Sequence, residues 1–280
     1  MSEILQALCK ALDKENSAAP FNGQMAKLLR GEQVSANDGR GTVRDNRRRT
    51  SRDAANTHPH RWPGASRKSD PHLVVLSDPK SMIAEQYRNL RTRILHVKAT
   101  RGFTTFLISS ALPAEGKTLT AVNLAIAIAQ GLEQTVLLVD ADLRHLGVTH
   151  LLGLETEAGL SEYLQGTTDL AACLVRLTDR LTILPAGSQP ANPTELLGSE
   201  KMATLLREVK HRDGKCIVLI DTLPVFPTTD ASLLAPEVDG VIFVIQAGRT
   251  PRDTARRALA QLSSTEVLGL VINDVNPLDL

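Results

Sequence analysis

The segment SSALPAEGKT at positions 109–118 constrains the fold of this chain more than any other part of the sequence. It follows an apolar run and precedes a long apolar helical stretch. A strand, a tight loop ending in Gly-Lys-Thr and a helix form the layout that holds nucleotide phosphates, because backbone N–H groups of the loop and of the helix N-terminus face the anion. Lys117 would add a positive charge and Thr118 a hydroxyl ligand for Mg²⁺. The usual pattern is G-x-x-x-x-G-K-[ST], and Ala111 replaces its first glycine, so this segment alone leaves a simple helix cap as the alternative.

Two other predicted strands end in acidic residues. One apolar run leads into Asp140 and Asp142, and a second ends in Asp221. In an open parallel sheet, ligands bind beyond the carboxyl ends of the strands, so these carboxylates should meet the Gly-Lys-Thr segment at one edge. A hydroxyl and one or two carboxylates beside phosphate oxygens are ligands that suit Mg²⁺. A single strand-end Asp is more often a helix cap or turn residue, but the three signals together predict binding of ATP or GTP.

Charge and composition bound the possible partners. The 280 residues carry a formal net charge of +1, so no overall field favours nucleic acid. A stretch with few apolar residues lies between 31 and 72, and arginines crowd into its segment 43–53. It buries too little apolar surface to offset its ordering entropy, so we expect a flexible linker, with an anionic lipid or nucleic-acid contact as the alternative. Residues 1–72 are therefore predicted to precede a nucleotide-binding domain at 73–280.

Cysteine usage and hydropathy give expectations about location. Cys9, Cys173 and Cys216 are odd in number and widely spaced, which fits no disulfide or metal pattern and favours a reducing cytosol. The N-terminus lacks the basic and apolar regions of a signal peptide, and no run of about 18 apolar residues is present. We therefore expect a cytoplasmic protein that needs another molecule to hold it at a membrane.

Strand and helix patterns alternate along most of the chain. A short amphipathic helix at 4–12 either docks on a partner or frays, and the sequence does not decide between them. Residues 73–76 are predicted to form an edge strand, and a helix is predicted at 81–95. Further strands are predicted at 104–110, 135–140, 181–185, 216–221, 240–246 and 267–273, and helices at 117–131, 194–211, 229–235 and 252–262. Continuous Val, Ile and Leu strands between helices predict an α/β fold with a mostly parallel sheet and helices on both faces.

Several stretches together match one known family. They are EQYRNLR at 85–91, SSALPAEGKT at 109–118, VLLVDADLR at 136–144, LPAGSQPANPTELL at 184–197, IVLIDT at 217–222 and VIFVIQAGRT at 241–250. With these motifs, the chain from about residue 73 onward resembles the cytoplasmic catalytic domain of bacterial tyrosine kinases (BY-kinases), which work with membrane polysaccharide-chain-length regulators.

The resemblance carries expectations about fold, activity and partners. It implies a P-loop NTPase fold related to the septum-site and plasmid-partitioning ATPases, with ATP and Mg²⁺ as cofactors. It implies tyrosine phosphorylation in exopolysaccharide or capsule synthesis and export, beside a membrane chain-length regulator (co-polymerase) that recruits the chain to the inner face of the plasma membrane. It also implies a homo-oligomer in which the helix carrying Glu85, Arg88 and Arg91 contacts a neighbouring subunit. Asn273 resembles the residue that contacts the adenine edge in related ATPases, and an ordinary turn residue is an equal alternative.

Each candidate site residue has an expected role. Phosphoryl transfer needs mainly positioning and charge neutralisation. Asp140 is the candidate base for an incoming hydroxyl or water, and Lys117 is the other expected catalytic residue. The expected ligands are Gly116, Lys117 and the backbone near Glu115 for the phosphates, and Thr118, Asp142 and Asp221 for Mg²⁺, directly or through water.

The chain also departs from the family pattern. Ala114 replaces a glycine that usually follows Pro113, which is expected to stiffen the loop and narrow backbone access to the β-phosphate. Leu223 stands where the family often has proline. The chain lacks a tyrosine-rich tail, and its two tyrosines, Tyr87 and Tyr163, lie in predicted helices.

Two functions remain open on the sequence. The first is tyrosine phosphorylation, and the second is a nucleotide-switched ATPase that positions a partner. Partitioning ATPases carry a signature lysine four residues before the second loop glycine, and here that position is Leu112. This difference favours the kinase, while the missing tyrosines leave room for an ATPase that does not phosphorylate itself.

Overall fold

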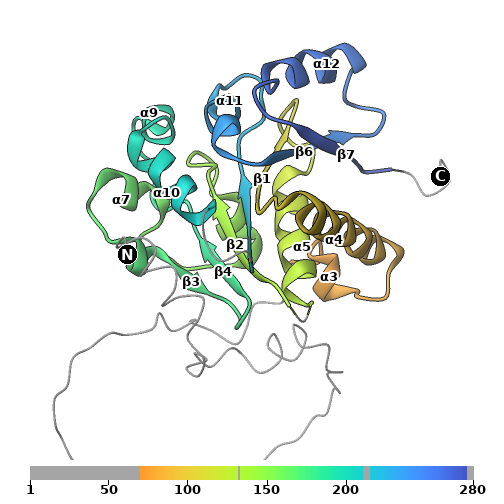
Figure 1. The fold of residues 1–280 in the computed structure, drawn as a ribbon, viewed down its shortest axis with the longest axis horizontal. Coiled ribbons are helices and arrows are strands. Elements are labelled where there is room, and N and C mark those ends of the chain that lie inside the picture. Colours follow the sequence, from red (N-terminus) through yellow and green to blue (C-terminus); the bar gives the residue numbers. More distant parts are fainter. Residues whose placement is uncertain (1–69, 132, 211–214, 276–280) are drawn as a thin grey trace, which may run out of the picture.

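A computed structural model describes residues 70–275, apart from 132 and 211–214. The helix expected at 4–12 and the arginine-rich segment at 43–53 lie outside these residues. The described chain forms a seven-stranded sheet with the order β3-β4-β2-β5-β1-β6-β7 (Figure 1). Its strands are β1 (Thr105–Ser110), β2 (Thr135–Asp140), β3 (Val175–Arg176), β4 (Leu181–Leu184), β5 (Cys216–Asp221), β6 (Gly240–Gln246) and β7 (Val267–Asn273).

Most of the sheet is parallel, as the sequence predicts. Among the strands that the structure describes, five neighbouring pairs run parallel, and only the short β3 pairs antiparallel, with β4. The order places β5 and β1 at the centre, with β2 and β6 beside them. The ends of β1, β2 and β5 therefore lie close together at one edge of the sheet, which is where the candidate site residues stand in the sequence.

Helices cover both faces of the sheet. They are α3 (Val74–Ser77), α4 (Met82–Arg101), α5 (Lys117–Ala129), α6 (Gly147–Leu152), α7 (Leu160–Gln165), α8 (Leu170–Cys173), α9 (Pro193–Leu197), α10 (Glu200–Lys210), α11 (Asp230–Leu234), the 3₁₀ helix η1 (Ala235–Glu237) and α12 (Arg252–Gln261). Because successive strand residues point to opposite faces, Phe106 and Ile108 pack with α3–α6, whereas Leu107 packs with α7–α12. The predicted two-faced α/β fold is confirmed.

The prediction of an edge strand at 73–76 is wrong. Residues Val74–Ser77 form a single helical turn, in which Ser77 N–H donates to Leu73 O at 2.9 Å. The backbone N–H of Val75 donates to the side chain of Asn123 on α5 at 3.2 Å, so this buried group is satisfied without a sheet partner. A four-residue apolar run does not distinguish a buried strand from a buried helical turn by its pattern alone.

The single helix predicted at 194–211 is also wrong, because two helices occupy this region. The first, α9, ends at Leu197, and α10 begins at Glu200. Between them, the Ser199 hydroxyl accepts a hydrogen bond from Met202 N–H at 3.3 Å, which is the usual role of a serine at a helix start. Position 211 lies outside the described residues. The sequence also gave no signal for α6, α8 and β3.

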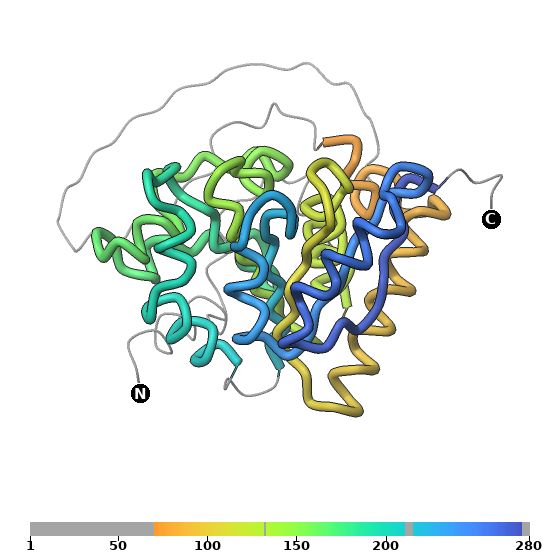
Figure 2. The backbone as a smooth tube through the Cα atoms, turned by 90° about the horizontal axis from the view of Figure 1, so that it is seen from above, coloured from red at the N-terminus to blue at the C-terminus, as the bar shows by residue number. Residues whose placement is uncertain are grey.

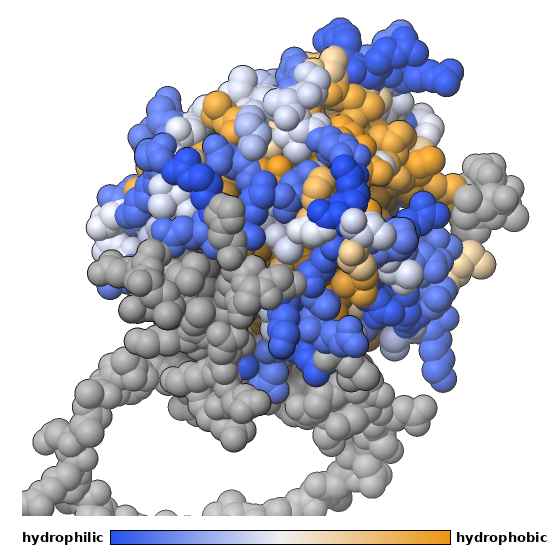
Figure 3. All heavy atoms as spheres, viewed as in Figure 1, coloured by the Kyte–Doolittle hydropathy of each residue, from blue (hydrophilic) through white to orange (hydrophobic). Residues whose placement is uncertain are grey.

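One edge of the sheet exposes apolar side chains. Leu270 and Ile272 of β7 alternate along the strand and are 52% and 58% exposed, and Figure 3 shows apolar surface on this side. Arg101 at the end of α4 forms an ion pair with Glu266 just before β7, and Figure 2 shows α4 beside the C-terminal strand. Within the described residues, none of the helices has the length and apolar character needed to span a bilayer.

Candidate active site

The loop between β1 and α5 presents a row of free backbone donors. The N–H groups of residues 114–118 make no hydrogen bond within the described part of the chain. Gly116, which precedes α5, has φ of 89°, a left-handed conformation that glycine adopts without strain. A helix N-terminus with unpaired N–H groups attracts anions, because the helix dipole adds to their partial positive charge. The loop therefore has the form that the sequence predicts for a phosphate site.

Ala114 adopts a left-handed conformation in this loop, with φ of 63°. The BY-kinase pattern usually has glycine at this position. The structure shows why, because a left-handed backbone costs a residue with a Cβ roughly 1–2 kcal/mol. The substitution therefore stores strain in the loop, in addition to stiffening it. Strained conformations persist where the surrounding structure holds them in place.

We expect Ala114→Gly to stabilise the protein. Release of the strain should outweigh the larger backbone entropy of glycine in the unfolded chain, for a net gain of about 0.5–1 kcal/mol in unfolding free energy. Chemical denaturation of the two proteins measures this difference. Ala111→Gly is a suitable control, since Ala111 is fully buried and has no positive φ. It should destabilise, and a loss of stability in both variants would contradict the strain argument.

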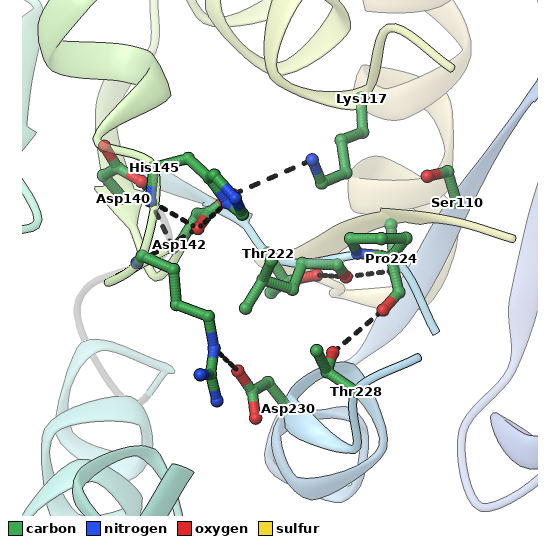
Figure 4. A network of polar contacts seen from close by, with 12 residues as sticks. Ser110, Lys117, Asp140, Asp142, His145, Thr222, Pro224, Thr228 and Asp230 are labelled. Carbon is green, nitrogen blue, oxygen red and sulfur yellow. Dashed lines mark hydrogen bonds and ion pairs between the residues drawn. The ribbon is translucent and has the colours of Figure 1, made fainter. Parts of the chain in front are cut away.

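Three buried carboxylates stand opposite Lys117. Asp140 and Asp221 are paired residues in the parallel register of β2 and β5, and Asp142 N–H donates to Asp140 Oδ1 at 3.2 Å. Lys117 Nζ lies 3.9 Å from Asp142 Oδ2, and Figure 4 shows the lysine extending toward this residue. The structure thus brings together the acidic residues that the sequence predicts for one edge of the sheet.

This arrangement raises the pKa of two of the carboxyl groups. Burial, reinforced by the neighbouring Asp221 and Asp142, raises the pKa of Asp140 well above its usual value. Burial also raises the pKa of Asp221 to about 7, while Lys117 and Thr118 oppose the rise. Three carboxylates with one lysine leave uncompensated negative charge in a buried place, and proteins form such clusters at functional sites.

The donor set fits a magnesium ion. Both carboxylate oxygens of Asp221 and Oδ2 of Asp140 are buried and have no hydrogen-bond partner, and Lys117 and Thr118 offset the desolvation of Asp221 only in part. Within the described residues, no three His, Cys, Asp or Glu side chains form a metal site by themselves. Mg²⁺ binds through few carboxylates and completes its shell with waters and phosphate oxygens, which matches a site of this kind.

Asn273 lies against the loop. Its Nδ2 donates to the backbone oxygen of Glu115 at 3.1 Å. A Cβ added to Gly116 would lie 2.0 Å from the same nitrogen, so the asparagine fills the space that this glycine leaves open. The sequence placed Asn273 at the adenine or in a turn, and gave no indication of a contact with the phosphate loop.

A second polar cluster joins the loop after β2 to two helices. Arg144 donates to the Thr194 hydroxyl at 2.9 Å, and its Nε lies 3.7 Å from Asp230 Oδ2. Thr194 in turn donates to Asp230 Oδ1 at 2.8 Å. His145 Nδ1 lies 3.0 Å from Asp142 Oδ1, and Figure 4 shows His145 beside Asp142. Sequence reasoning assigned no role to His145, Thr194 or Asp230, although the first two stand in or beside the matched motifs.

The helix with the predicted subunit contact makes contacts within its own chain. Arg88 pairs with Glu85 at 2.5 Å and also donates to Pro79 O. Arg91 donates to Ala127 O at 3.1 Å, near the C-terminus of α5. These contacts neither require nor exclude a neighbouring subunit, so the predicted interface stays a prediction.

Both tyrosines of the sequence are buried. Tyr87 is 9% exposed and Tyr163 is 6% exposed. Tyr87 packs in the apolar cluster with α3–α6, and Lys201 Nζ lies 4.5 Å above the ring of Tyr163. Burial raises the pKa of Tyr163 to about 12. Each tyrosine therefore exposes only a small part of its surface in this fold.

The fold and the loop define a P-loop NTPase-type domain. No protein-family model matches the chain. Tyrosine-protein kinase YwqD of Bacillus subtilis is 35% identical over 205 residues, which are 72% of this chain and 85% of YwqD. Putative tyrosine-protein kinase CapB of Staphylococcus aureus is 32% identical over 211 residues, or 74% of this chain and 90% of CapB. Succinoglycan biosynthesis transport protein ExoP of Rhizobium meliloti is 36% identical over 73% of this chain, which spans only 27% of ExoP.

Solved structures agree with these relatives. The kinase domain of the Escherichia coli tyrosine kinase ETK superposes with a TM-score of 0.67 at 28% identity, over 75% of this chain and 84% of that domain. The chimerical protein CapA2B2 superposes with a TM-score of 0.66 at 29% identity, over 74% of this chain and 91% of that one. The chain belongs to the bacterial tyrosine-protein kinase family.

Proposed function

We propose that this chain transfers the γ-phosphoryl group of ATP to tyrosine hydroxyls, with Mg²⁺ bound beside the phosphates. The observation that carries the proposal is the loop at 114–118, whose N–H groups are free and whose Lys117 Nζ lies 3.9 Å from Asp142, one of three buried carboxylates. This combination places positive donors where a polyphosphate would sit and unpaired acidic oxygens where its cation would sit. It suits phosphoryl transfer, which needs positioning and electrostatic stabilisation.

The residues divide this work between them. The N–H groups of 114–118 and Lys117 would bind the phosphates, with Gly116 allowing close backbone approach. Thr118, Asp142 and Asp221 would hold the ion, which when bound neutralises phosphate charge. Asp140 would take the proton of the incoming hydroxyl, because a raised pKa makes a carboxylate a better base near neutral pH.

A transfer assay with labelled ATP tests this proposal. The purified protein is incubated with ATP·Mg²⁺ alone and with a tyrosine-containing cytoplasmic segment of a candidate membrane partner, and phosphotyrosine and released phosphate are measured. We expect phosphotyrosine on the partner and none with Lys117→Met. Phosphate release without any phosphotyrosine would overturn the kinase proposal and support the nucleotide-switched ATPase.

No phosphotyrosine is expected on the 280-residue chain itself. Tyr87 and Tyr163 are the tyrosines of the sequence, and both lie in apolar clusters. Exposing either would require local unfolding, which removes the packing that holds α4 or α7 in place. Mass spectrometry after incubation with ATP·Mg²⁺ measures the modification. Phosphate at Tyr87 or Tyr163 in folded protein would show that this burial is not maintained.

The proposal extends to a biological setting. A relative is named as a succinoglycan biosynthesis transport protein, which supports a role in exopolysaccharide or capsule synthesis and export. We propose a cytoplasmic location with recruitment to the inner face of the plasma membrane by a polysaccharide chain-length regulator. Co-purification from membranes measures this association. We expect the chain to co-purify with such a regulator and to be absent from membranes when the regulator is deleted.

Self-association through α4 is a separate expectation. Glu85 is 57% exposed, so its carboxylate is available to exchange its partner within the chain for one on a neighbouring subunit. We expect the wild type to associate in the presence of ATP·Mg²⁺ and a variant with Glu85→Ala, Arg88→Ala and Arg91→Ala to remain monomeric with unchanged ATP affinity, because a buried interface charge that loses its partner costs several kcal/mol.

Sedimentation velocity compares these proteins. Arg93→Ala is the matched control, since Arg93 is an exposed arginine on the same helix outside the motif. Thermal unfolding should be measured in parallel, because Arg91 also contacts Ala127 O on α5. Equal association of the wild type and the triple variant would remove the assembly proposal.

A further inference from the structure

Two residues outside the phosphate loop, one after β6 and one at the end of β7, form hydrogen bonds with it. The side chain of Glu115 is 2% exposed. One of its carboxylate oxygens accepts from Leu112 N–H at 2.7 Å, and the other accepts from the Thr250 hydroxyl. Because that hydroxyl also accepts from Gln246 N–H at 2.9 Å, its single proton is free to point at Glu115. The buried carboxylate of Glu115 therefore joins two parts of the loop and also connects the loop to the turn that contains Thr250.

Asn273 makes a second contact with the loop, at the peptide unit between Glu115 and Gly116. Its Nδ2 donates to the backbone oxygen of Glu115 at 3.1 Å. In a trans peptide, the C=O of one residue and the N–H of the next point in opposite directions. The Gly116 N–H is therefore directed away from Asn273. The end of β7 is itself fixed, since Asn273 O accepts from Ala247 N–H at 2.9 Å.

The strain at Ala114 indicates that these contacts hold the loop in a conformation it would otherwise leave. Its φ of 63° is unfavourable for alanine, and such a backbone persists only where its surroundings fix it. The Glu115 side chain spans this strained residue, because it joins Leu112 to Thr250. Loss of the contact of Glu115 with either Thr250 or Asn273 would let the loop relax and change the direction of its N–H groups.

We infer that Thr250 and Asn273 are positioning residues for the polyphosphate, acting through the backbone of Glu115 and Gly116. This inference rests on the proposed nucleotide binding. If Asn273 contacted the adenine, it would affect only ligands that carry a base. Under the present inference, the affinity for a phosphate chain without a base also depends on Asn273. A loop already ordered before binding avoids the loss of conformational freedom on binding.

Binding of ATP and of inorganic tripolyphosphate to the full chain tests the inference. With Mg²⁺ present, Thr250→Val and Asn273→Ala should each weaken both ligands by about tenfold and in equal proportion, as expected for the loss of one hydrogen bond that orders the site. Thr250→Ser keeps the hydroxyl and should restore both affinities. Thermal unfolding of every variant establishes that the fold is intact.

Each other outcome counts against the inference. If Asn273→Ala weakens ATP alone and tripolyphosphate binds as before, Asn273 acts on the base and its positioning role is overturned. Unchanged binding of both ligands in Thr250→Val and Asn273→Ala overturns the role of both residues. If the wild type binds neither ligand, the proposed nucleotide function itself fails, and this result is distinct from a failure confined to the variants.

Discussion

An Asp140→Asn variant is expected to bind ATP·Mg²⁺ at least as tightly as the wild type while losing roughly 100-fold or more of its phosphoryl transfer. Asp140 is fully buried, and its Oδ2 has no hydrogen-bond partner. The amide of asparagine has the same shape and keeps an oxygen to accept from Asp142 N–H. It removes a negative charge near the phosphates but cannot take a proton from an incoming hydroxyl.

Paired measurements of binding and turnover separate this role from a structural one. Isothermal titration gives the affinity, and labelled ATP gives phosphotyrosine and phosphate release. Lys117→Met serves as the contrasting control, because loss of its charge beside the loop should weaken binding as well as turnover. Loss of both properties in Asp140→Asn would sink its assignment as the base, and so would unchanged turnover.

Much of the fold follows from local sequence patterns. The strands ending in Asp140 and Asp221 are continuous apolar runs buried on both faces, and a parallel sheet places their ends side by side. The four-residue run at 73–76 had no such context. Its helical turn depends on Asn123 of α5, which accepts from a buried backbone N–H 48 residues earlier in the chain. A tertiary contact of this kind leaves no local pattern to detect.

The candidate site likewise has a part that local sequence patterns predict and a part that they do not. Lys117 and the strand-end carboxylates were predictable because short motifs fix both their type and their place. The contact between Asn273 and Glu115 joins residues 158 positions apart, and the one between Arg144 and Thr194 spans 50. Matched stretches contain Glu115, Arg144 and Thr194 but not Asn273, and only the folded chain shows that Asn273 contacts the loop.

The pKa of Asp221 makes the stability of the ligand-free protein depend on pH. Its pKa rises on folding to about 7 from 3.8, so the folded state binds the proton more tightly than the unfolded state. Stability is therefore lost as the pH rises from about 4 to about 7, and the loss is complete above that range. At about 1.4 kcal/mol for each pKa unit, this amounts to at most about 4 kcal/mol.

We expect Asp221→Asn to remove this dependence. The variant should be close to the wild type in unfolding free energy near pH 4 and more stable by up to about 4 kcal/mol at pH 8, as measured by denaturant unfolding without nucleotide or metal. Adding ATP·Mg²⁺ at pH 8 should stabilise the wild type more than the variant, because an oxygen expected to hold the ion has been replaced.

Asp239→Asn is a control of opposite sign. Burial alone would raise the pKa of Asp239, but the ion pair with Lys210 at 2.8 Å and the N–H groups of Thr104 and Thr105 lower it overall. Its contribution is present above the unfolded pKa and is lost as the pH falls, so Asp239→Asn should destabilise at pH 8 and have less effect at low pH. A difference between the wild type and Asp221→Asn that stays constant from pH 4 to 8 would mean that Asp221 keeps its ordinary pKa. Burial would then impose no net penalty on the ionised form of Asp221 for a cation to offset.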